Sequence, residues 1–574
     1  MNDAVTTVFG LAGGLAMFLF GMNSMSDALQ KAAGEKMKKI LGFLTKNPIM
    51  GALAGALVTA VLQSSSATTV MVIGFVSAGL MTLPQAISVI FGANIGTTMT
   101  AQLMAFQITD YIYPIIFIGF LIYFVSKKER VKNIGMVIFS FGLLFEGIEI
   151  MGSVMKPLAT SAIFIDLMGK VADIPVLGIV LGAVMTLVVQ SSSATIAVLQ
   201  NFASQAGPDG VTSVMGLAGA IPILLGDNIG TTITALLASI GQSKSAKRTA
   251  ISHSIFNITG SIVFSFLLKP FAAFVTFISP RGNEVDVIAR QIANAHTSFN
   301  VACTLIWLPL IPLMVKLVTT IIPGEDTRER EAFQPQYLDN NILDQPVAAM
   351  YVTSQEINRC ADFVSALLVS AKGMLEGLQN EGSVLIEQYQ TVERLHDSIA
   401  TYITRLFARG GLTELQAEQT AGLLYIANGI DRIAERSNEV TQWLSELKTS
   451  NRDLSPTAYT ELAACYTIAE RMLTNAITAV RNSDTELARA VLRDKKKMQK
   501  AQKRFNKAHL ARVKEGKCNA ELTTGFSNIL YSIDRMVDSC AGIAEEAFEH
   551  TVFITLEETT PEDTPLDAAA QPVV

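Results

Sequence analysis

Two polar hexapeptides interrupt apolar stretches of this chain. Gln63–Thr68 and Gln190–Thr195 both read Gln-Ser-Ser-Ser-Ala-Thr, and an Asn-Ile-Gly-Thr-Thr string follows each of them, at Asn94–Thr98 and Asn228–Thr232. We call the hexapeptides the cassettes and the pentapeptides the Asn strings. Their hydroxyl and amide side chains both donate and accept hydrogen bonds. The neutral oxygens suit a hard cation such as Na⁺, whereas hydroxyls and free backbone N–H groups suit an oxyanion.

Such side chains are costly inside a bilayer unless they line a cavity or bind a ligand. Serine-rich patches also mediate close helix packing in membranes, so a single cassette would leave that role equally open. Two matched pairs in the same order favour a duplicated transporter with its site between the halves. Neither cassette contains Lys or Arg. A divalent anion would therefore need co-bound cations and the positive ends of helices to offset its charge, which is a physical reason for cation coupling.

Composition divides the chain. Half of its 574 residues are hydrophobic and 16% are charged, but residues 1–320 carry the long apolar runs of membrane spans. We expect a transmembrane domain over 1–320, a linker over 321–344, a soluble helical domain over 345–556 and a disordered tail over 557–574. The net charge of −6 indicates no nucleic-acid partner. The five cysteines lack metal or disulfide spacing, and no enzyme motif occurs, so we expect free thiols and no catalysis.

The predicted fold is all-α, a polytopic membrane protein with two inverted repeats, over about 5–107 and 133–242. Each repeat contains a stretch too long for one span and broken by a cassette, which predicts a re-entrant helical hairpin. We also expect the helices that carry the Asn strings to break there, since Gly and Thr allow an interruption that lines a cavity. The expected hairpins are 49–80 and 174–205, the Asn-string helices are 83–107 and 213–242, and the other spans are 5–26, 110–125, 133–152, 249–270 and 296–320.

Topology follows from charge and from the number of crossings. Basic clusters lie at Lys36–Lys39, Lys127–Arg130 and Lys244–Arg248, and the positive-inside rule places them in the cytoplasm. Each repeat contributes two crossings, because a re-entrant hairpin contributes none, and the span 110–125 between the repeats adds one more. The number of crossings before the second repeat is therefore odd, so the second repeat is upside down relative to the first. This predicts an external N-terminus, a first hairpin that opens to the cytoplasm, a second that opens to the exterior, and a cytoplasmic soluble domain.

The cassettes and Asn strings resemble those of the sodium–phosphate cotransporter family, which includes bacterial members related to the animal type II transporters. The resemblance covers about residues 1–320. It implies a bacterial inner-membrane protein that transports inorganic phosphate with Na⁺ as the coupling ion and without an organic cofactor. The residues that it implies for the site are Gln63, Ser64, Ser65, Ser66, Asn94, Thr97, Thr98, Gln190, Ser191, Ser192, Ser193, Asn228, Thr231 and Thr232.

Other polar residues of the membrane half have two interpretations each. The echoed strings His253–Asn257 and His296–Asn300, similar to strings of the same family, could hydrogen-bond helices together or form a pH-sensitive wall of the site. Glu146 and Glu149 could act within a span or be solvated at its end. Asp227, which replaces Ala93 of the first copy, could cap a half-helix or help to hold a cation.

The soluble half reads as two units of three helices and resembles the PhoU family of phosphate-signalling proteins over about 345–556. The acidic pairs Asp431/Glu435 and Asp534/Asp538 share one helix face at i, i+4 spacing. They could hold a metal weakly, or form a solvated face beside Arg432 and Arg535. The resemblance suggests a regulatory role and a signalling partner. Two alternative functions keep the same architecture: transport of another oxyanion or a carboxylate, and a non-transporting membrane sensor of phosphate.

Overall fold

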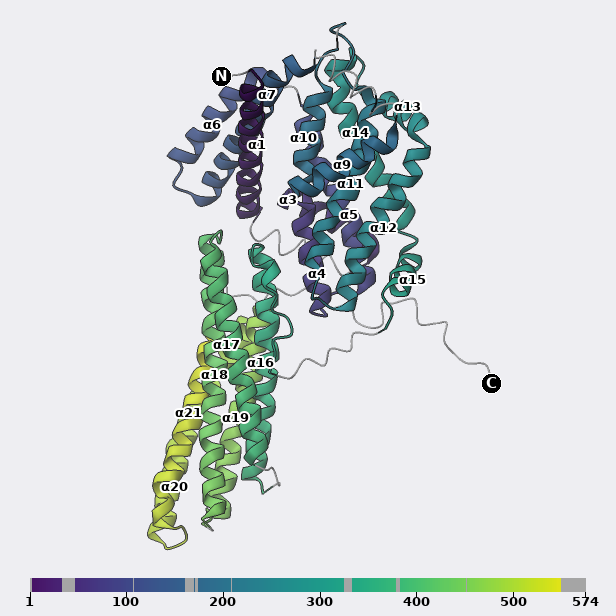
Figure 1. Cartoon of the computed structure of the whole chain (residues 1–574). Helices are drawn as coiled ribbons and strands as arrows, with labels where there is room; N and C mark the ends of the chain where they lie inside the picture. The colour runs from purple at the N-terminus through teal and green to yellow at the C-terminus, as the bar shows by residue number, and fades with distance from the viewer. Residues whose placement is uncertain are drawn as a thin grey trace, which may run out of the picture. The chain divides into compact units, whose positions relative to one another are not determined.

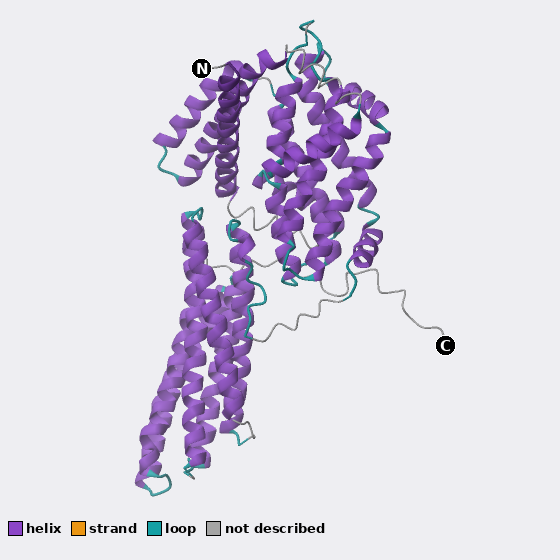
Figure 2. Cartoon of the chain, viewed as in Figure 1, coloured by secondary structure: helices purple, strands orange, loops and turns teal. Residues whose placement is uncertain are grey.

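The computed structural model describes residues 3–33, 47–106, 108–159, 170, 174–207, 209–324, 333–377, 382–450 and 452–548. The predicted tail over 557–574, part of the linker and the basic cluster Lys36–Lys39 lie outside these ranges. Within them, the regular elements are helices, as expected, and one isolated bridge joins Ala206 and Ser213 (Figure 2). The chain divides into two compact units, which we call unit 1 and unit 2, with the boundary between Thr327 and Arg328.

Unit 1 is built from helices that are mostly apolar (Figure 1). They are α1 (Asp3–Ala33), α3 (Pro48–Leu62), α4 (Ser65–Ser77), α5 (Leu83–Met104), η1 (Thr109–Tyr111), α6 (Ile112–Val125), α7 (Glu129–Ala159), α9 (Pro175–Val189), α10 (Ser192–Ala203), α11 (Gly216–Ala238), α12 (Lys244–Phe266), α13 (Leu268–Ile278), α14 (Glu284–Trp307) and α15 (Ile311–Ile321). In the described ranges, three helices are long and apolar enough to cross a membrane, or up to six if each bent pair is one span.

Two of the expected spans are not straight. The chain bends by 92° between α12 and α13, within the span expected over 249–270, and by 85° between α14 and α15, within the span expected over 296–320. Proline explains both bends, because it lacks an N–H and its ring clashes with the carbonyl four residues before it. Pro270 follows the end of α12 by four residues, and Pro309 and Pro312 follow the end of α14.

The breaks expected at the Asn strings do not occur, because α5 and α11 run unbroken through them. Their glycines serve close packing instead. A Cβ on Gly96 would lie 2.6 Å from the Thr59 Cβ of α3, and a Cβ on Gly230 would lie 2.9 Å from the Thr186 Cβ of α9. The expectation of a break was therefore wrong: glycine here lets two helices approach, which needs no distortion of the backbone.

The same helix packing occurs in both copies. A Cβ on Gly92 of α5 would overlap the Ala52 carbonyl of α3, and a Cβ on Gly226 of α11 would overlap the Ile179 carbonyl of α9. Gly92 and Gly226 hold the same place relative to their Asn strings, and Ala52 and Ile179 hold the same place relative to their cassettes. Duplication is thus a property of the packed structure as well as of the sequence.

Helices α1 and α7 pack closely through glycines. A Cβ on Gly21 would lie 2.7 Å from the Leu144 nitrogen, and a Cβ on Gly147 would lie 2.5 Å from the Phe18 nitrogen. As residue numbers rise in α1, those of the contacted residues fall in α7, so the two helices run antiparallel.

In the part of unit 2 that the structure describes, six long helices surround a core of leucine, isoleucine, valine and alanine side chains. Its elements are η2 (Asn340–Ile342), α16 (Pro346–Leu375), α17 (Gly382–Arg409), α18 (Glu414–Thr449), α19 (Pro456–Asn482), α20 (Thr485–Lys514), η3 (Ala520–Leu522) and α21 (Thr523–Glu545). Polar caps define where several helices begin. Thr413 and Gln416 form a capping box at α18, and Ser455 caps α19 ahead of Pro456.

Candidate functional site in unit 1

Each cassette forms the tip of a helix–turn–helix. The chain leaves α3 through Gln63 in the left-handed region (φ 51°), and Ser64 then accepts a hydrogen bond from the Ala67 N–H (3.2 Å) as the N-cap of α4. Gln190 (φ 54°) and Ser191 repeat this geometry between α9 and α10. A non-glycine residue with positive φ is uncommon and is concentrated at functional sites. Its occurrence at the same position of both copies indicates a required backbone shape.

A threonine pair closes each tip. Thr59 of α3 donates to Thr68 of α4 (2.8 Å), and Thr186 of α9 lies 3.1 Å from Thr195 of α10. The residues of each pair are nine apart, a separation that would span about 13 Å along a continuous helix. The chain therefore reverses direction at the cassette.

The tips present hydrogen-bond donors that a ligand could use. The first N–H groups of α4 and α10 have no intrahelical acceptor, and a helix N-terminus attracts negative charge. The residues Ser65, Ser192 and Ser193 are more than nine-tenths buried, and their hydroxyls make no hydrogen bond to any residue that the structure describes. These three hydroxyls are therefore available to a bound ion.

Side chains also join the first copy to the second. Thr234 of α11 donates to Ser66 of the first cassette (3.1 Å), and Gln200 of α10 donates to the Ala101 carbonyl of α5 (3.1 Å). Each hairpin therefore contacts the Asn-string helix of the other copy. The structure thus brings the first cassette and the second copy together within hydrogen-bonding distance.

The Asn strings use their amides in structural hydrogen bonds. Asn94 Oδ1 lies 3.1 Å from His253 Nε2 of α12, and Asn228 Oδ1 accepts from Asn300 Nδ2 of α14 (3.3 Å). Both asparagine Nδ2 atoms donate to carbonyls one turn back, and so do the hydroxyls of Thr97, Thr98, Thr231 and Thr232. These hydroxyls retain free lone pairs that could face a cation, whereas the asparagines hold helices together.

Comparison with known proteins identifies the family. The family model described as Na⁺/Pi-cotransporter matches residues 17–153 and again residues 154–279. The chain is 32% identical over 311 residues to the uncharacterized protein YqeW of Bacillus subtilis, which covers 54% of this chain and 97% of that protein. The chain belongs to the Na⁺/Pi-cotransporter family. Together with the apolar helices, this assignment indicates a membrane protein, and its family is of the transporter type.

Other relatives agree with this assignment to the cotransporter family. A Salmonella typhimurium protein named "Putative inorganic phosphate export protein YjbB" is 23% identical over 522 residues, which are 88% of this chain and 91% of that protein. The sodium-dependent phosphate transport protein 2A of Rattus norvegicus is 36% identical over 97 residues, 17% of this chain and 15% of that protein. The PhoU domain model matches residues 464–547 of unit 2. No solved structure matches significantly.

Four threonines at the tips were not predicted as site residues of this cotransporter-family chain. They are Thr59 and Thr186, described above, Thr100, which donates to Gln63 Oε1 (2.9 Å), and Thr234. A signal for them exists in the sequence. Threonine stands four residues before the cassette glutamine in both copies, and again six residues after the asparagine of the Asn string. Extension of the repeat alignment beyond the two strings would have found them.

The two cassette glutamines differ in their surroundings, which yields a matched prediction. The Gln63 side chain is buried and bonded to Thr100 and to the Ala60 carbonyl, whereas Gln190 is exposed and its side chain bonds to no described residue. We expect Gln190→Ala to weaken phosphate affinity about tenfold without a change in stability, because it removes only a ligand contact. We expect Gln63→Ala also to cost about 1–2 kcal/mol of stability, because Thr100 loses its acceptor.

Uptake as a function of phosphate concentration, together with thermal unfolding in detergent, measures both effects. Unchanged transport kinetics in both variants would remove the glutamines from the site.

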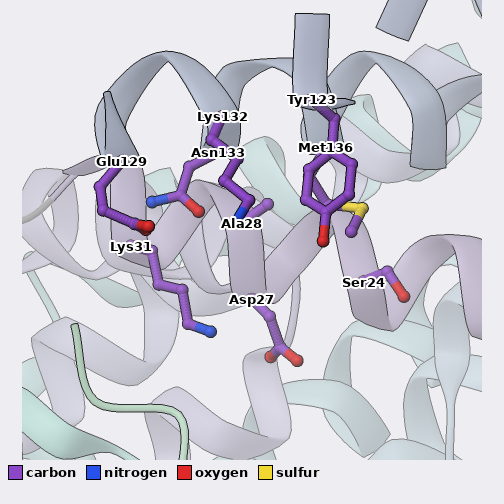
Figure 3. Close-up of a pocket in the computed structure, with 9 residues that line it drawn as sticks. All are labelled: Ser24, Asp27, Ala28, Lys31, Tyr123, Glu129, Lys132, Asn133 and Met136. Carbon is purple, nitrogen blue, oxygen red and sulfur yellow. The ribbon is translucent and has the colours of Figure 1, made fainter. Parts of the chain in front are cut away.

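The acidic residues of α7 lie apart from the tips. Glu149 is exposed and lines a cavity of about 310 Å³ together with Asn201, Gln205 and Asp286. This geometry supports the interpretation of Glu149 as a solvated residue at the end of a span. A second cavity, of about 270 Å³, lies between α1 and the α6–α7 pair (Figure 3). Two lysines and two carboxylates line it, Lys31, Lys132, Asp27 and Glu129. Their charges balance, so this cavity does not favour a divalent anion.

The acidic pairs of unit 2 lie on α18 and α21. The structure describes no group of three or more metal-ligating side chains there or elsewhere in its described ranges. Asp538 instead pairs with Lys495 (2.9 Å) and Arg535 (3.1 Å), and Asp431 lies 4.0 Å from His396. Burial raises the pKa of Asp431 and of Asp534, while Glu435 contacts Arg436. Asp431, Glu435 and Asp538 thus lie beside basic neighbours, as in the solvated-face interpretation, whereas Asp534 forms no ion pair with a described residue and keeps one buried oxygen without a partner.

A cavity of about 280 Å³ between α18 and α21 is lined mainly by basic side chains. Three arginines line it, Arg432, Arg436 and Arg535, with one carboxylate, Asp538. Arg436 is paired with Glu439 (2.6 Å) and Arg535 with Asp538, but Arg432 forms no ion pair with a described residue. Planar guanidinium groups suit oxyanions, so this cavity could hold one.

Proposed function

We propose that unit 1 transports inorganic phosphate coupled to Na⁺ by alternating access, without a covalent intermediate. One observation carries the proposal: in both cassettes, buried serine residues whose hydroxyls have no described partner stand at the N-terminus of a helix, where an oxyanion is favoured. Since no Lys or Arg lies in the cassettes, a phosphate dianion would be poorly neutralised alone. Co-bound Na⁺ would supply the missing positive charge, and transport of either ion would then depend on the other.

We further propose that the two copies are inverted repeats. The packing of α1 on α7 supports this. The string Phe18–Met22 of the first copy resembles Leu144–Ile148 of the second, and Gly21 meets Leu144 while Gly147 meets Phe18, so each glycine contacts the counterpart of the other's partner. An antiparallel pair with exchanged contacts has a local two-fold axis perpendicular to the helices. In Figure 1, α4 and α10 lie towards opposite ends of unit 1, as hairpins that open to opposite sides would.

The proposed orientation has support from the loops. Ser77 at the end of α4 donates to Gln242 Oε1 (2.7 Å). Gln242 stands just before the basic cluster Lys244–Arg248. The end of the first hairpin therefore lies on the same side as that cluster, which the positive-inside rule assigns to the cytoplasm. Ser213, beyond the second hairpin, contacts Glu284 at the start of α14. We therefore propose a bacterial inner-membrane location with an external N-terminus and a cytoplasmic unit 2.

Flux into liposomes tests the transport proposal. Purified protein should take up radioactive phosphate when a Na⁺ gradient is imposed, and K⁺ in place of Na⁺ should reduce the initial rate at least about tenfold, if each Na⁺ contributes one charge-neutralising contact. Excess sulfate or a dicarboxylate should leave phosphate uptake unchanged. Flux that ignores Na⁺ would refute the coupling, and stronger inhibition by sulfate or a dicarboxylate than by phosphate itself would identify a different substrate.

For unit 2 we propose regulation of transport. The PhoU match and the arginine-lined cavity on α18 and α21 support an anion as the regulatory signal. We also propose that a signalling partner binds unit 2 and distinguishes its anion-bound form from its free form. Arg432, which forms no ion pair with a described residue, would supply the positive charge for such an anion.

A further inference from the structure

We propose that Asp227, with Thr186 and Thr195, forms a Na⁺ site that only the second copy contains. The inference rests on the proposed transport function and assigns one coupling ion to particular residues. It begins with the burial of the Asp227 carboxylate, which has no exposed surface. One carboxylate oxygen, Oδ1, accepts a hydrogen bond from Thr186 (2.6 Å), and the other, Oδ2, has no hydrogen-bond partner.

A buried carboxylate oxygen without a partner needs a physical explanation. No Lys, Arg or His among the described residues forms an ion pair with Asp227. Isolated carboxylates inside low-dielectric surroundings are strongly unfavourable unless a cation or a full set of hydrogen bonds accompanies them. The residue therefore requires a positive partner that the chain itself does not provide.

A capping role does not supply that explanation. Asp227 lies in the interior of α11, eleven residues after the helix begins at Gly216. Its backbone is therefore already part of the helical hydrogen-bond ladder, and no free N–H group of a helix start lies beside its side chain. The capping interpretation of the sequence was wrong because it depended on a break in α11 that does not exist.

A proton could neutralise the carboxylate, but it would occupy one oxygen and recruit no further ligand. A hard cation differs, because it collects oxygen ligands. The carboxylate, Thr186 Oγ1 and Thr195 Oγ1 together offer oxygens of the kind that Na⁺ prefers.

The threonines connect this carboxylate to the cassette. The Thr186 hydroxyl donates to Asp227, and its oxygen lies 3.1 Å from Thr195 Oγ1, which donates to the Ser191 carbonyl (3.3 Å). Thr195 stands in the first turn of α10 and is the last residue of the second cassette. A cation held by Asp227 would thus neutralise negative charge beside the anion site, and an empty carboxylate would repel the anion. Na⁺ binding would therefore precede phosphate binding.

The first copy lacks the carboxylate. Its equivalent threonine pair, Thr59 and Thr68, is present at 2.8 Å, but buried Ala93 stands where Asp227 stands in the second copy. The close glycine contacts between the helices that carry the pair are repeated in both copies. The difference predicts unequal cation binding by two otherwise similar halves.

Direct ²²Na⁺ binding to the purified full chain in detergent tests this site without reference to transport. We expect Asp227→Asn to bind one Na⁺ fewer per chain than the wild type. In liposomes, its half-saturating Na⁺ concentration for phosphate uptake should rise at least about tenfold, the loss of roughly one charge-assisted contact. Asp110→Asn removes an exposed carboxylate of unit 1 and should match the wild type. Asp227→Ala, the residue found in the first copy, provides a second variant if the asparagine variant does not fold.

Unchanged ²²Na⁺ stoichiometry and affinity in the folded Asp227 variants would overturn the proposal. The proposal would also be overturned if the Asp227 variants lost the pH dependence of uptake but kept the wild-type response to Na⁺. That result would make Asp227 a proton carrier. Failure of the transport proposal is distinguishable, because wild-type protein would then show no Na⁺-driven uptake while ²²Na⁺ binding would still report on Asp227.

Discussion

Alanine at both Ser65 and Ser192 should reduce Na⁺-driven phosphate uptake by a factor of about 10²–10⁴. Both residues are more than nine-tenths buried, and neither hydroxyl bonds to a described residue, so each is free to donate to a bound anion. A hydrogen bond to a charged group contributes about 1.5–3 kcal/mol, so two losses amount to about 3–6 kcal/mol of binding energy. The initial rate of phosphate uptake into liposomes at a fixed Na⁺ gradient measures the effect.

Stability should change little in this double variant, because neither hydroxyl has a partner to lose. Ser153→Ala is the matched control. Ser153 is exposed on α7 and bonds only to the Ile150 carbonyl of its own helix, so its removal should leave uptake at the wild-type rate. If the double variant kept more than half of the wild-type rate, the serine hydroxyls would not be ligands of the transported anion.

Gly226→Ala should destabilise unit 1. The added methyl group would overlap the Ile179 carbonyl of α9, and a backbone carbonyl, unlike a flexible side chain, cannot move aside. Overpacking of a tight core costs about 1–3 kcal/mol and sometimes more. We expect the midpoint of thermal unfolding in detergent to fall by several degrees, and Gly92→Ala in the first copy to behave in the same way.

The control for this pair is Gly13→Ala. Gly13 lies within α1, and a Cβ there would meet no atom within 4 Å. Alanine is the better helix former, by about 1 kcal/mol, so this variant should be as stable as the wild type or slightly more so. A Gly226→Ala protein with the thermal midpoint of Gly13→Ala would contradict the close packing of α9 on α11.

The sequence was sufficient for those features that depend on local patterns. The cassettes interrupt apolar runs too long for one span, and the chain does reverse there, at Gln63 and Gln190. Composition separated the apolar helices from the long polar ones. The paired strings predicted the family, because either string alone would be unspecific.

Features that depend on packing could not be predicted in this way. Glycine in the Asn strings is compatible with a broken helix and with a close helix contact, and only the position of Thr59 or Thr186 opposite it decides between them. The partners of Asn94 and Asn228, His253 and Asn300, lie more than 70 residues away in sequence. The bends after α12 and α14 could have been predicted, because the nearby prolines Pro270, Pro309 and Pro312 are a local sequence signal for them.

The number of phosphate ions bound per chain tests the central claim, that the two copies build one shared site. Equilibrium binding of radioactive phosphate to the purified full chain, at saturating Na⁺, should give one phosphate per chain. Either Ser65→Ala or Ser192→Ala alone should weaken that single site by about tenfold or more. Two phosphates per chain, or a variant in which one site disappears while a second keeps wild-type affinity, would contradict a site shared between the halves.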